Sequence, residues 1–281
     1  MFAGPEKLRR LMPVLRRLPP PLVQELLAVL AIGDGLVGST RFHRASAWAA
    51  AQGLSGLARR RLALALLANH GRFVAAEAMI SAPTADSLGR GVVIDGAEHL
   101  HARGDGALLL GFHLGPPKIW LALRALGHPV RFAGRFEEQG DPRWQDAFAG
   151  GDAVQLAWAA PGDRAQSLLR IRNLLRYGAL VYLSADGPMG REAFRIDLAG
   201  GPLVIRAGWL ALRHALRVAT LPVLSHREGT RLVITIHEPL PDYDGNLVRD
   251  EAMCREALTP LLADYVRRFP DQCRYLAFPR W

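Results

Sequence analysis

The sequence contains very little lysine. Only Lys7 and Lys118 occur among 35 lysine and arginine residues, so arginine supplies nearly all of the positive charge. Against 26 aspartate and glutamate residues this gives a formal net charge of +9. Such an excess favours an anionic partner, which could be nucleic acid, an acidic membrane surface or a phosphorylated molecule. Because a guanidinium group binds phosphate in a planar, bidentate manner, the arginine content suits phosphate recognition.

Cysteine and long apolar runs are scarce as well. Cys254 and Cys273 fit neither a disulfide framework nor the spacing of a zinc site, so we expect two reduced thiols and no metal. No run of about 20 apolar residues, the length that a spanning helix needs, is present. The apolar run Leu26–Ile32 is short and begins too late for a secretory signal. These absences predict a cytoplasmic protein whose contact with a membrane, if any, is peripheral.

Several well-known sequence motifs are also missing. The chain has no Gly-x-Ser-x-Gly elbow, phosphate-binding loop, dinucleotide fingerprint or zinc-protease pair. Nor does a nucleic-acid-binding motif accompany the basic charge. Binding to RNA or DNA therefore rests on charge alone, and salt-dependent binding to duplexes would reveal it.

The length and the hydrophobic pattern predict one globular domain over residues 1–281, because the chain has 281 residues of which 50% are hydrophobic. Within it we expect a helical amino-terminal region over 1–90, an α/β core over 91–240, and a closing helix with a tail over 241–281. The amino-terminal helices are predicted at Leu8–Leu18, after Pro19-Pro20-Pro21 to about Ile32 with an end at Gly33-Asp34-Gly35, at Thr40–Gln52 and from Ala58 to about Ile80. The first of these carries arginines opposite its leucines, which fits a helix lying on an anionic membrane surface and equally a helix packed on its own domain.

The centre of the chain predicts a strand, a turn and a helix in succession. The apolar run Ala107–Leu110 is followed by a Gly/Pro turn, and a second apolar run, Ile119–Leu126, ends at Gly127. In such a unit the turn lies beyond the carboxyl end of the strand, where open α/β sheets bind their ligands. His113 lies in that turn and is therefore a candidate site residue.

Hydrophobic periodicity predicts the remaining elements of the core. A short strand followed by a helix is expected over Val92–Leu100. Further strands are predicted at Val130–Ala133, Ala179–Ser184, Phe194–Leu198, Arg217–Val223 and, as an outer strand, Arg231–His237. Helices are predicted at Ala165–Tyr177, with Leu168, Ile171, Leu174 and Leu175 inward, at Ile205–Leu216, and along an apolar stripe from Leu258 to Phe269 that contains Pro260. The fold class is α/β, with a central, mainly parallel or mixed sheet flanked by helices.

Around His113 the sequence resembles the lysophospholipid acyltransferase superfamily, and in particular its lipid A late acyltransferase branch. The family pattern Gly-x-His-x-Gly-x-x-acid is matched by Gly111, His113 and Gly115. The turn from Asp186 to Arg191 is similar to one that follows the second central strand in this superfamily. The resemblance implies a glycerolipid acyltransferase-like fold and transfer of an acyl chain, with His113 as general base. The donor would be an acyl-carrier-protein or coenzyme A thioester, and no resident cofactor would be needed.

The resemblance also implies an acceptor and a set of binding residues. The acceptor would be a hydroxyl or amine, most simply on a glycolipid or lysophospholipid at the inner membrane face. Arg135, just after a predicted strand, would hold a phosphate of the acceptor. Gly115, Gly187 and Arg191 would line the substrate site. The Gly200-Gly201-Pro202 turn would present backbone N–H groups to an anionic group, although a plain helix start explains it equally well.

One position departs from the family pattern, because Lys118 stands where the pattern has its acid. A lysine only donates hydrogen bonds, and its charge would disfavour the imidazolium that forms during proton transfer. Asp186 could supply the missing carboxylate, with Glu137 or Glu138 as further candidates and Lys118 neutralising a carrier phosphate or an oxyanion. Asp186 could also merely close its own turn. The alternative function is a catalytically altered family member that binds acyl chains or acyl carrier protein without turnover.

Overall fold

The computed structural model describes residues 14–15, 17–38, 40–79, 91–101, 106–116, 119–134, 153–155, 161–187 and 191–278. Its helices are α2 (Pro20–Gly38), α3 (Thr40–Ala51), α4 (Gly56–Met79), η2 (Ala97–His101), α6 (Ile119–Ala125), α8 (Pro161–Arg176), α9 (Gly208–Leu216), α10 (Leu247–Arg268), η3 (Pro270–Gln272) and α11 (Arg274–Ala277), where η marks a 3₁₀ helix. Its strands are β1 (Val92–Asp95), β2 (Ala107–Gly111), β3 (Val130–Gly134), β4 (Ala153–Gln155), β5 (Leu180–Ser184), β6 (Glu192–Leu198), β7 (Gly201–Arg206), β8 (Thr220–Glu228) and β9 (Arg231–Ile236). The division of the chain at residues 90 and 240 stays a prediction.

Seven of the described strands form one sheet in the order β1-β9-β8-β2-β5-β3-β4. Strand β2 lies at its centre, with parallel neighbours β5 and β8 on its two sides. Only β8 and β9 pair antiparallel among these neighbours, so the sheet is mixed and the predicted α/β class is confirmed. The prediction of an outer strand at Arg231–His237 is wrong, because β9 lies between β1 and β8.

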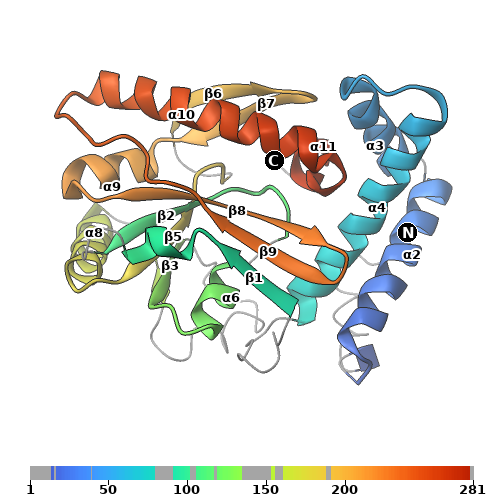
Figure 1. Cartoon of the computed structure of the whole chain (residues 1–281), viewed down its shortest axis with the longest axis horizontal. Coiled ribbons are helices and arrows are strands. Elements are labelled where there is room, and N and C mark those ends of the chain that lie inside the picture. The colour runs from blue at the N-terminus through green and yellow to red at the C-terminus, as the bar shows by residue number, and fades with distance from the viewer. Residues whose placement is uncertain are drawn as a thin grey trace.

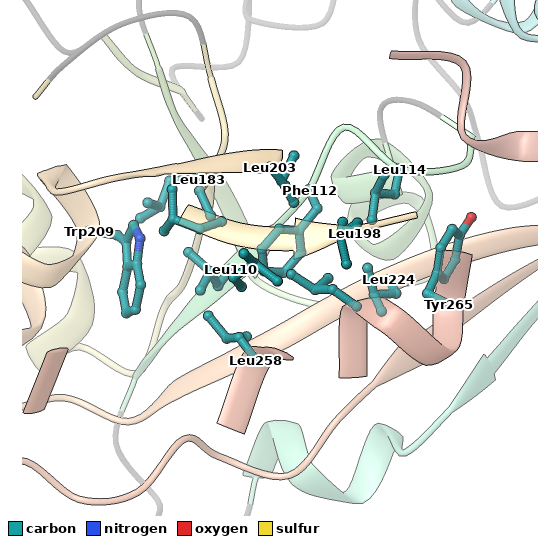
Figure 2. Packing of buried hydrophobic residues seen from close by; sticks show 14 of the residues in the cluster. Leu110, Phe112, Leu114, Leu183, Leu198, Leu203, Trp209, Leu224, Leu258 and Tyr265 are labelled. Carbon is teal, nitrogen blue, oxygen red and sulfur yellow. The ribbon is translucent and has the colours of Figure 1, made fainter. Parts of the chain in front are cut away.

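Helices cover both faces of the sheet (Figure 1). Side chains alternate along β2, so that Leu108 and Leu110 join one apolar cluster and Ala107 and Leu109 the other. The first cluster contains residues of α8, α9, α10 and the β6–β7 hairpin, and Figure 2 shows Leu110 within it. The second cluster contains residues of α6. Because β2 is buried on both faces, its sequence is an unbroken apolar run.

A hairpin stands where the sequence predicted a turn and the start of a helix. Strands β6 and β7 pair antiparallel around Gly200 and Gly201, and α9 begins only at Gly208. At Gly200, whose φ is +99°, a Cβ would lie 2.2 Å from the ring of Trp48, so only glycine fits. The predicted helix start at Ile205 is therefore wrong. The Gly200-Gly201-Pro202 turn does not precede a helix and offers no helix dipole to an anion.

The helix α2 runs on through Gly33-Asp34-Gly35, where the sequence predicted its end. The reason is packing on α4: a Cβ at Gly35 would lie 2.6 Å from Leu67, and one at Gly71 would lie 2.2 Å from the carbonyl oxygen of Leu27. Close helix contact outweighs the low helix propensity of glycine. The predicted helix Leu8–Leu18 falls mainly outside the described residues.

Other boundaries differ by a few residues. Arg217 ends α9 in the left-handed conformation, with φ of 51°, so β8 starts at Thr220 and continues to Glu228. The side chain of Leu168 is 45% exposed, so its predicted inward position on α8 is wrong. Pro260 lies inside α10, as predicted. Among the described helices none is by itself long and apolar enough to cross a membrane, although Pro21–Val37 and Thr40–Ala51, bent by 96°, meet that length and composition test together.

Candidate active site

Strand register brings His113 and Asp186 to the same point. Gly111 at the end of β2 pairs with Ser184 at the end of β5, and each of the two polar residues follows two positions later. Because the strands are parallel, equal offsets from paired residues end at the same edge of the sheet. The chain leaves β2 for α6 on one face and reaches α9 on the other after β5. Adjacent strands that lead to opposite faces form the crevice in which open sheets bind ligands.

The carboxylate of Asp186 holds both the main chain and the ring of His113. The backbone N–H of His113 donates to both carboxylate oxygens, at 3.0 and 2.9 Å, and Nδ1 lies 2.9 Å from Oδ1. Since a carboxylate oxygen only accepts, Nδ1 carries the hydrogen and Nε2 is the basic nitrogen. The Asp186 side chain is 2% exposed whereas that of His113 is 29% exposed, so the acid lies behind the imidazole. This arrangement can accept a proton from a bound hydroxyl.

The first glycine of the pattern makes room for an aromatic side chain. A Cβ at Gly111 would lie 1.8 Å from the phenol oxygen of Tyr182, on the neighbouring strand β5. Burial, and secondarily the negative charge of Asp186, raises the pKa of Tyr182 well above its usual value. The phenol therefore stays neutral beside the carboxylate at physiological pH. Sequence reasoning missed Tyr182, because its proximity to Gly111 depends on the pairing of β2 with β5.

The second glycine fixes the turn to β8 and α10. Gly115 has φ of +74°, and a Cβ there would lie 2.0 Å from the carbonyl oxygen of Ser225. That oxygen accepts a hydrogen bond of 2.6 Å from the phenol of Tyr265, while the Ser225 hydroxyl donates to the carbonyl of Pro116 at 3.0 Å. Ser225 lies two residues beyond Val223, the β8 partner of Gly111. The same offset from three adjacent strands thus builds the site.

A cation that sequence reasoning missed supports the Asp186 turn. The Nε of Arg206 donates to the carbonyl of Gly187 at 2.9 Å, and its backbone N–H donates to Ala185 at 2.7 Å. The backbone N–H of Ala185 in turn bonds the carbonyl of Gly111 at 2.8 Å. Arg206 is half-buried at the end of β7. It was overlooked because residues 205–216 were taken to be one helix.

A second missed contact comes from the carboxyl-terminal segment. The ring of Tyr275, on α11, meets the imidazole of His113 edge to face, with 5.1 Å between ring centroids and 72° between planes. Arg274 donates to the phenol oxygen of Tyr275 at 2.7 Å. No strand-end rule could have found this residue, since it follows a helix that crosses the sheet.

The structure separates the predicted site residues into two groups. It brings His113, Asp186, Gly115 and Gly187 together, while Arg191 is exposed and its carbonyl accepts from the backbone N–H of Ala207 at 2.8 Å. The positions predicted for Lys118, Arg135, Glu137 and Glu138 lie outside the described residues. The functional roles of all these residues stay predictions.

Among the described residues, metal ligands do not gather around this pair. Within the described ranges, no group of three or more His, Cys, Asp or Glu side chains could hold a metal ion. Cys254 and Cys273 are buried free thiols. Burial raises the pKa of Cys254 to about 12, which makes it a poor nucleophile.

Comparison with known proteins gives a structural likeness only. No protein-family model matches the sequence, and no curated protein matches it. Solved structures that match include the crystal structure of the 1-acyl-sn-glycerophosphate acyltransferase PlsC from Thermotoga maritima, at 12% sequence identity and a TM-score of 0.41, over 86% of this chain and 95% of that one. The fold class assigned above rests on the strand order of the protein itself.

Proposed function

We propose that the protein transfers an acyl chain from a thioester to a hydroxyl or amine acceptor, with His113 as general base and Asp186 as the carboxylate that orients it. The single observation that supports the proposal is the contact of Asp186 with both the backbone N–H and Nδ1 of His113. Asp186 thereby supplies the carboxylate that the family pattern has at the position of Lys118. The donor is an acyl-carrier-protein or coenzyme A thioester.

The reaction balances with these two side chains. The acceptor oxygen attacks the thioester carbonyl carbon while its proton passes to Nε2 of His113. The new C–O bond forms, the C–S bond breaks, and the same proton passes from Nε2 to the departing sulfur. Asp186 holds Nδ1–H throughout and stabilises the transient imidazolium, as a buried carboxylate does in other histidine-dependent acyl transfers.

An anionic headgroup on the acceptor agrees with the charge around the pair. Arg206 donates to the carbonyl of Gly187, the residue after Asp186, and a guanidinium near this turn suits binding of a phosphate. Arg135 and Lys118 are further candidates for the same group or for a carrier phosphate. The proposed acceptor is accordingly a lysophospholipid or a phosphorylated glycolipid.

An acyl-transfer assay with purified protein tests the proposal, using coenzyme A and carrier-protein thioesters with both acceptor types. His113→Ala should lower the rate by about 10²- to 10⁴-fold. Asp186→Asn should lower it by a similar factor, about 10⁴-fold at most, because the wrong tautomer becomes available. The matched control is His99→Ala, a histidine on η2 for which acyl transfer has no use. Equal rates for His113→Ala and the parent would contradict the assignment of His113 as the base. Thioester binding without turnover in the parent would favour the alternative, a catalytically altered protein that only binds the acyl group.

We further propose that the protein works at the inner face of the cell membrane, attached peripherally. The outer side of α2 carries an apolar stripe at helical spacing, and α2 lies outside α4 in Figure 1. The stripe consists of Leu22, Leu26, Val29, Leu36 and Val37, which are 53%, 40%, 64%, 58% and 87% exposed. Arg17, before the helix, and Arg44, after it, are also exposed, which suits anionic lipid.

Co-sedimentation with lipid vesicles tests this attachment. Vesicles containing anionic phospholipid should retain the parent, and neutral phosphatidylcholine vesicles should retain less of it. Val29→Glu with Leu36→Glu should release the protein, because two charges enter the apolar stripe. Tyr177→Glu, at an 89% exposed position after α8, is the matched control and should stay bound. Equal retention of all three proteins would contradict the assignment.

A further inference from the structure

The carboxyl-terminal segment Pro270–Phe278 contacts the imidazole of His113 through Tyr275. Tyr275 contacts the imidazole edge to face at 5.1 Å between centroids. An imidazole held by one hydrogen bond can still turn about that bond, whereas a second contact on the ring fixes its plane. The Asp186 carboxylate on Nδ1 and the Tyr275 ring thus restrain His113 independently of each other.

Tyr275 is itself held by Arg274. The guanidinium carbon of Arg274 lies 4.5 Å from the centroid of the Tyr275 ring and 5.6 Å from that of Phe73 on α4. One guanidinium nitrogen also donates to the phenol oxygen of Tyr275 at 2.7 Å. Arg274 is only 2% exposed, so these contacts form in a desolvated environment, where a cation–ring interaction is strongest.

The segment is anchored to elements on both sides of the site. The side chain of Gln272 bonds the backbone of Arg227 twice, donating at 3.0 Å and accepting at 2.8 Å, which extends the β8 ladder. The indole N–H of Trp48 on α3 donates to the carbonyl of Pro270 at 2.8 Å. These contacts set the position of Tyr275 before any substrate binds.

We propose that Tyr275 is a positioning residue for His113, with Arg274 holding it in place, and that the carboxyl-terminal segment therefore completes the active site. The Tyr275 ring keeps the imidazole in the rotamer in which Nδ1–H meets Asp186 and Nε2 is presented to the acceptor. The effect on rate rests on the proposed acyl transfer. The effect on the imidazole does not, because it follows from the ring contact alone.

The test combines histidine-ring NMR with the transfer assay. Two-bond ¹H–¹⁵N spectra, assigned with His113→Gln, report the tautomer of His113 in the free protein. The parent and Tyr275→Phe, which keeps the ring, should show mainly the Nδ1–H form. Tyr275→Leu and Tyr275→Met, whose side chain is longer and more flexible than that of leucine, should shift His113 toward the Nε2–H form that free histidine prefers. The matched control is Tyr243→Leu, which removes a ring stacked on another histidine, His214, at 4.8 Å.

Rates should follow the spectra. Tyr275→Leu and Tyr275→Met should lower kcat by about 10- to 100-fold at nearly unchanged KM, because the base is displaced and the binding groups are not, and Tyr275→Phe should restore it to near the parent value. If the Tm of Tyr275→Leu lies far below that of the parent, kcat of the parent is compared with that of Tyr275→Met instead.

Three results would overturn the inference: an unchanged His113 tautomer in both variants that lack the ring, the same tautomer shift in Tyr243→Leu, or an unchanged kcat in both ring-free variants of an active protein. If the parent transfers no acyl group from any thioester, the proposed function fails, and the tautomer spectra still decide whether Tyr275 positions His113.

Discussion

Substitution of Gly115 by alanine should destabilise the protein, because the added Cβ would clash with the carbonyl oxygen of Ser225 and with the phenol oxygen of Tyr265 that donates to it. The added Cβ would lie 2.0 Å from the Ser225 oxygen, where ordinary contact begins at 3.4 Å. That oxygen belongs to the backbone of β8, where Ser225 pairs with Ile234 of β9, so it cannot swing away as a side-chain tip could. The substitution therefore has to displace the His113 turn or part of the sheet.

The magnitude follows from three contributions. Alanine at a φ of +74° costs roughly 1–2 kcal/mol. Overpacking against a fixed backbone atom costs about 1–3 kcal/mol. Displacing the Ser225 oxygen weakens the Tyr265 hydrogen bond, for about 1 kcal/mol more. We expect a total loss of about 3–6 kcal/mol in the free energy of unfolding, visible as a drop of about 1–2 M in the urea midpoint.

Two matched glycines separate these contributions. Gly178 has nearly the same φ, +77°, with no atom within 4 Å of the built Cβ, so Gly178→Ala should cost only the conformational part, about 1–2 kcal/mol. Gly96 has φ of +76° and a carbonyl oxygen, that of Ile236, at 2.1 Å, so Gly96→Ala should cost nearly as much as Gly115→Ala. Only Gly115→Ala should change the His113 tautomer or acyl transfer. Equal urea midpoints for Gly115→Ala and Gly178→Ala would refute the reasoning.

Two further predictions concern buried charge. Asp250→Ala leaves Arg213, 2% exposed, without the carboxylate that it contacts at 2.9 Å, and should cost about 3–5 kcal/mol by urea unfolding. Asp264→Ala, which removes an exposed partner of Arg267 and Arg268, should cost less than about 1 kcal/mol, and similar losses for both would contradict the assignment. Burial, and secondarily the charge of His99, lowers the pKa of His237 below 6.5, so the unfolded chain binds more protons between the two values and stability should rise with pH up to about 6.5. His237→Gln should flatten that part of the profile of Tm against pH, and an unchanged slope would count against it.

The sequence was most informative where an element is determined by its own residues. The strand β2 and the helix α6 were predicted within one residue of their bounds, because an apolar run between glycines leaves few alternatives. Strand β7 was missed because its apolar residues Leu203 and Ile205 directly precede the apolar residues of α9. Two inward residues are too few to distinguish a strand pattern from the start of that helix. The continuation of α2 past Gly33 depended on the surface of α4, which local propensity does not contain.

The candidate site was predictable only as far as strand ends determine it. His113 and Asp186 could be placed at one edge because both follow apolar strands, although their adjacency required β2 and β5 to be neighbours. Arg206 and Tyr275 arrive from a hairpin and from a carboxyl-terminal helix, and no spacing in the sequence relates them to His113. Their contacts are consequences of packing between elements remote in the chain.

Because Asp186 follows a different strand from His113, the contact between the two depends on strand pairing. An acid five residues after the histidine would lie in the same turn, so its contact with the imidazole would depend on that turn alone. Asp186 is 73 residues away, and its contacts with His113 depend on the pairing of Gly111 with Ser184. Because side chains alternate along a strand, a slip of one residue between β2 and β5 would turn Asp186 away from the imidazole. Tyr182 on β5 fills the space that Gly111 leaves and so opposes such a slip, while Ser225 fixes the neighbouring strand β8 against Gly115 in the same way. The two glycines of the motif thus act on the proposed base indirectly, because they fix the strands β5 and β8 against the His113 turn.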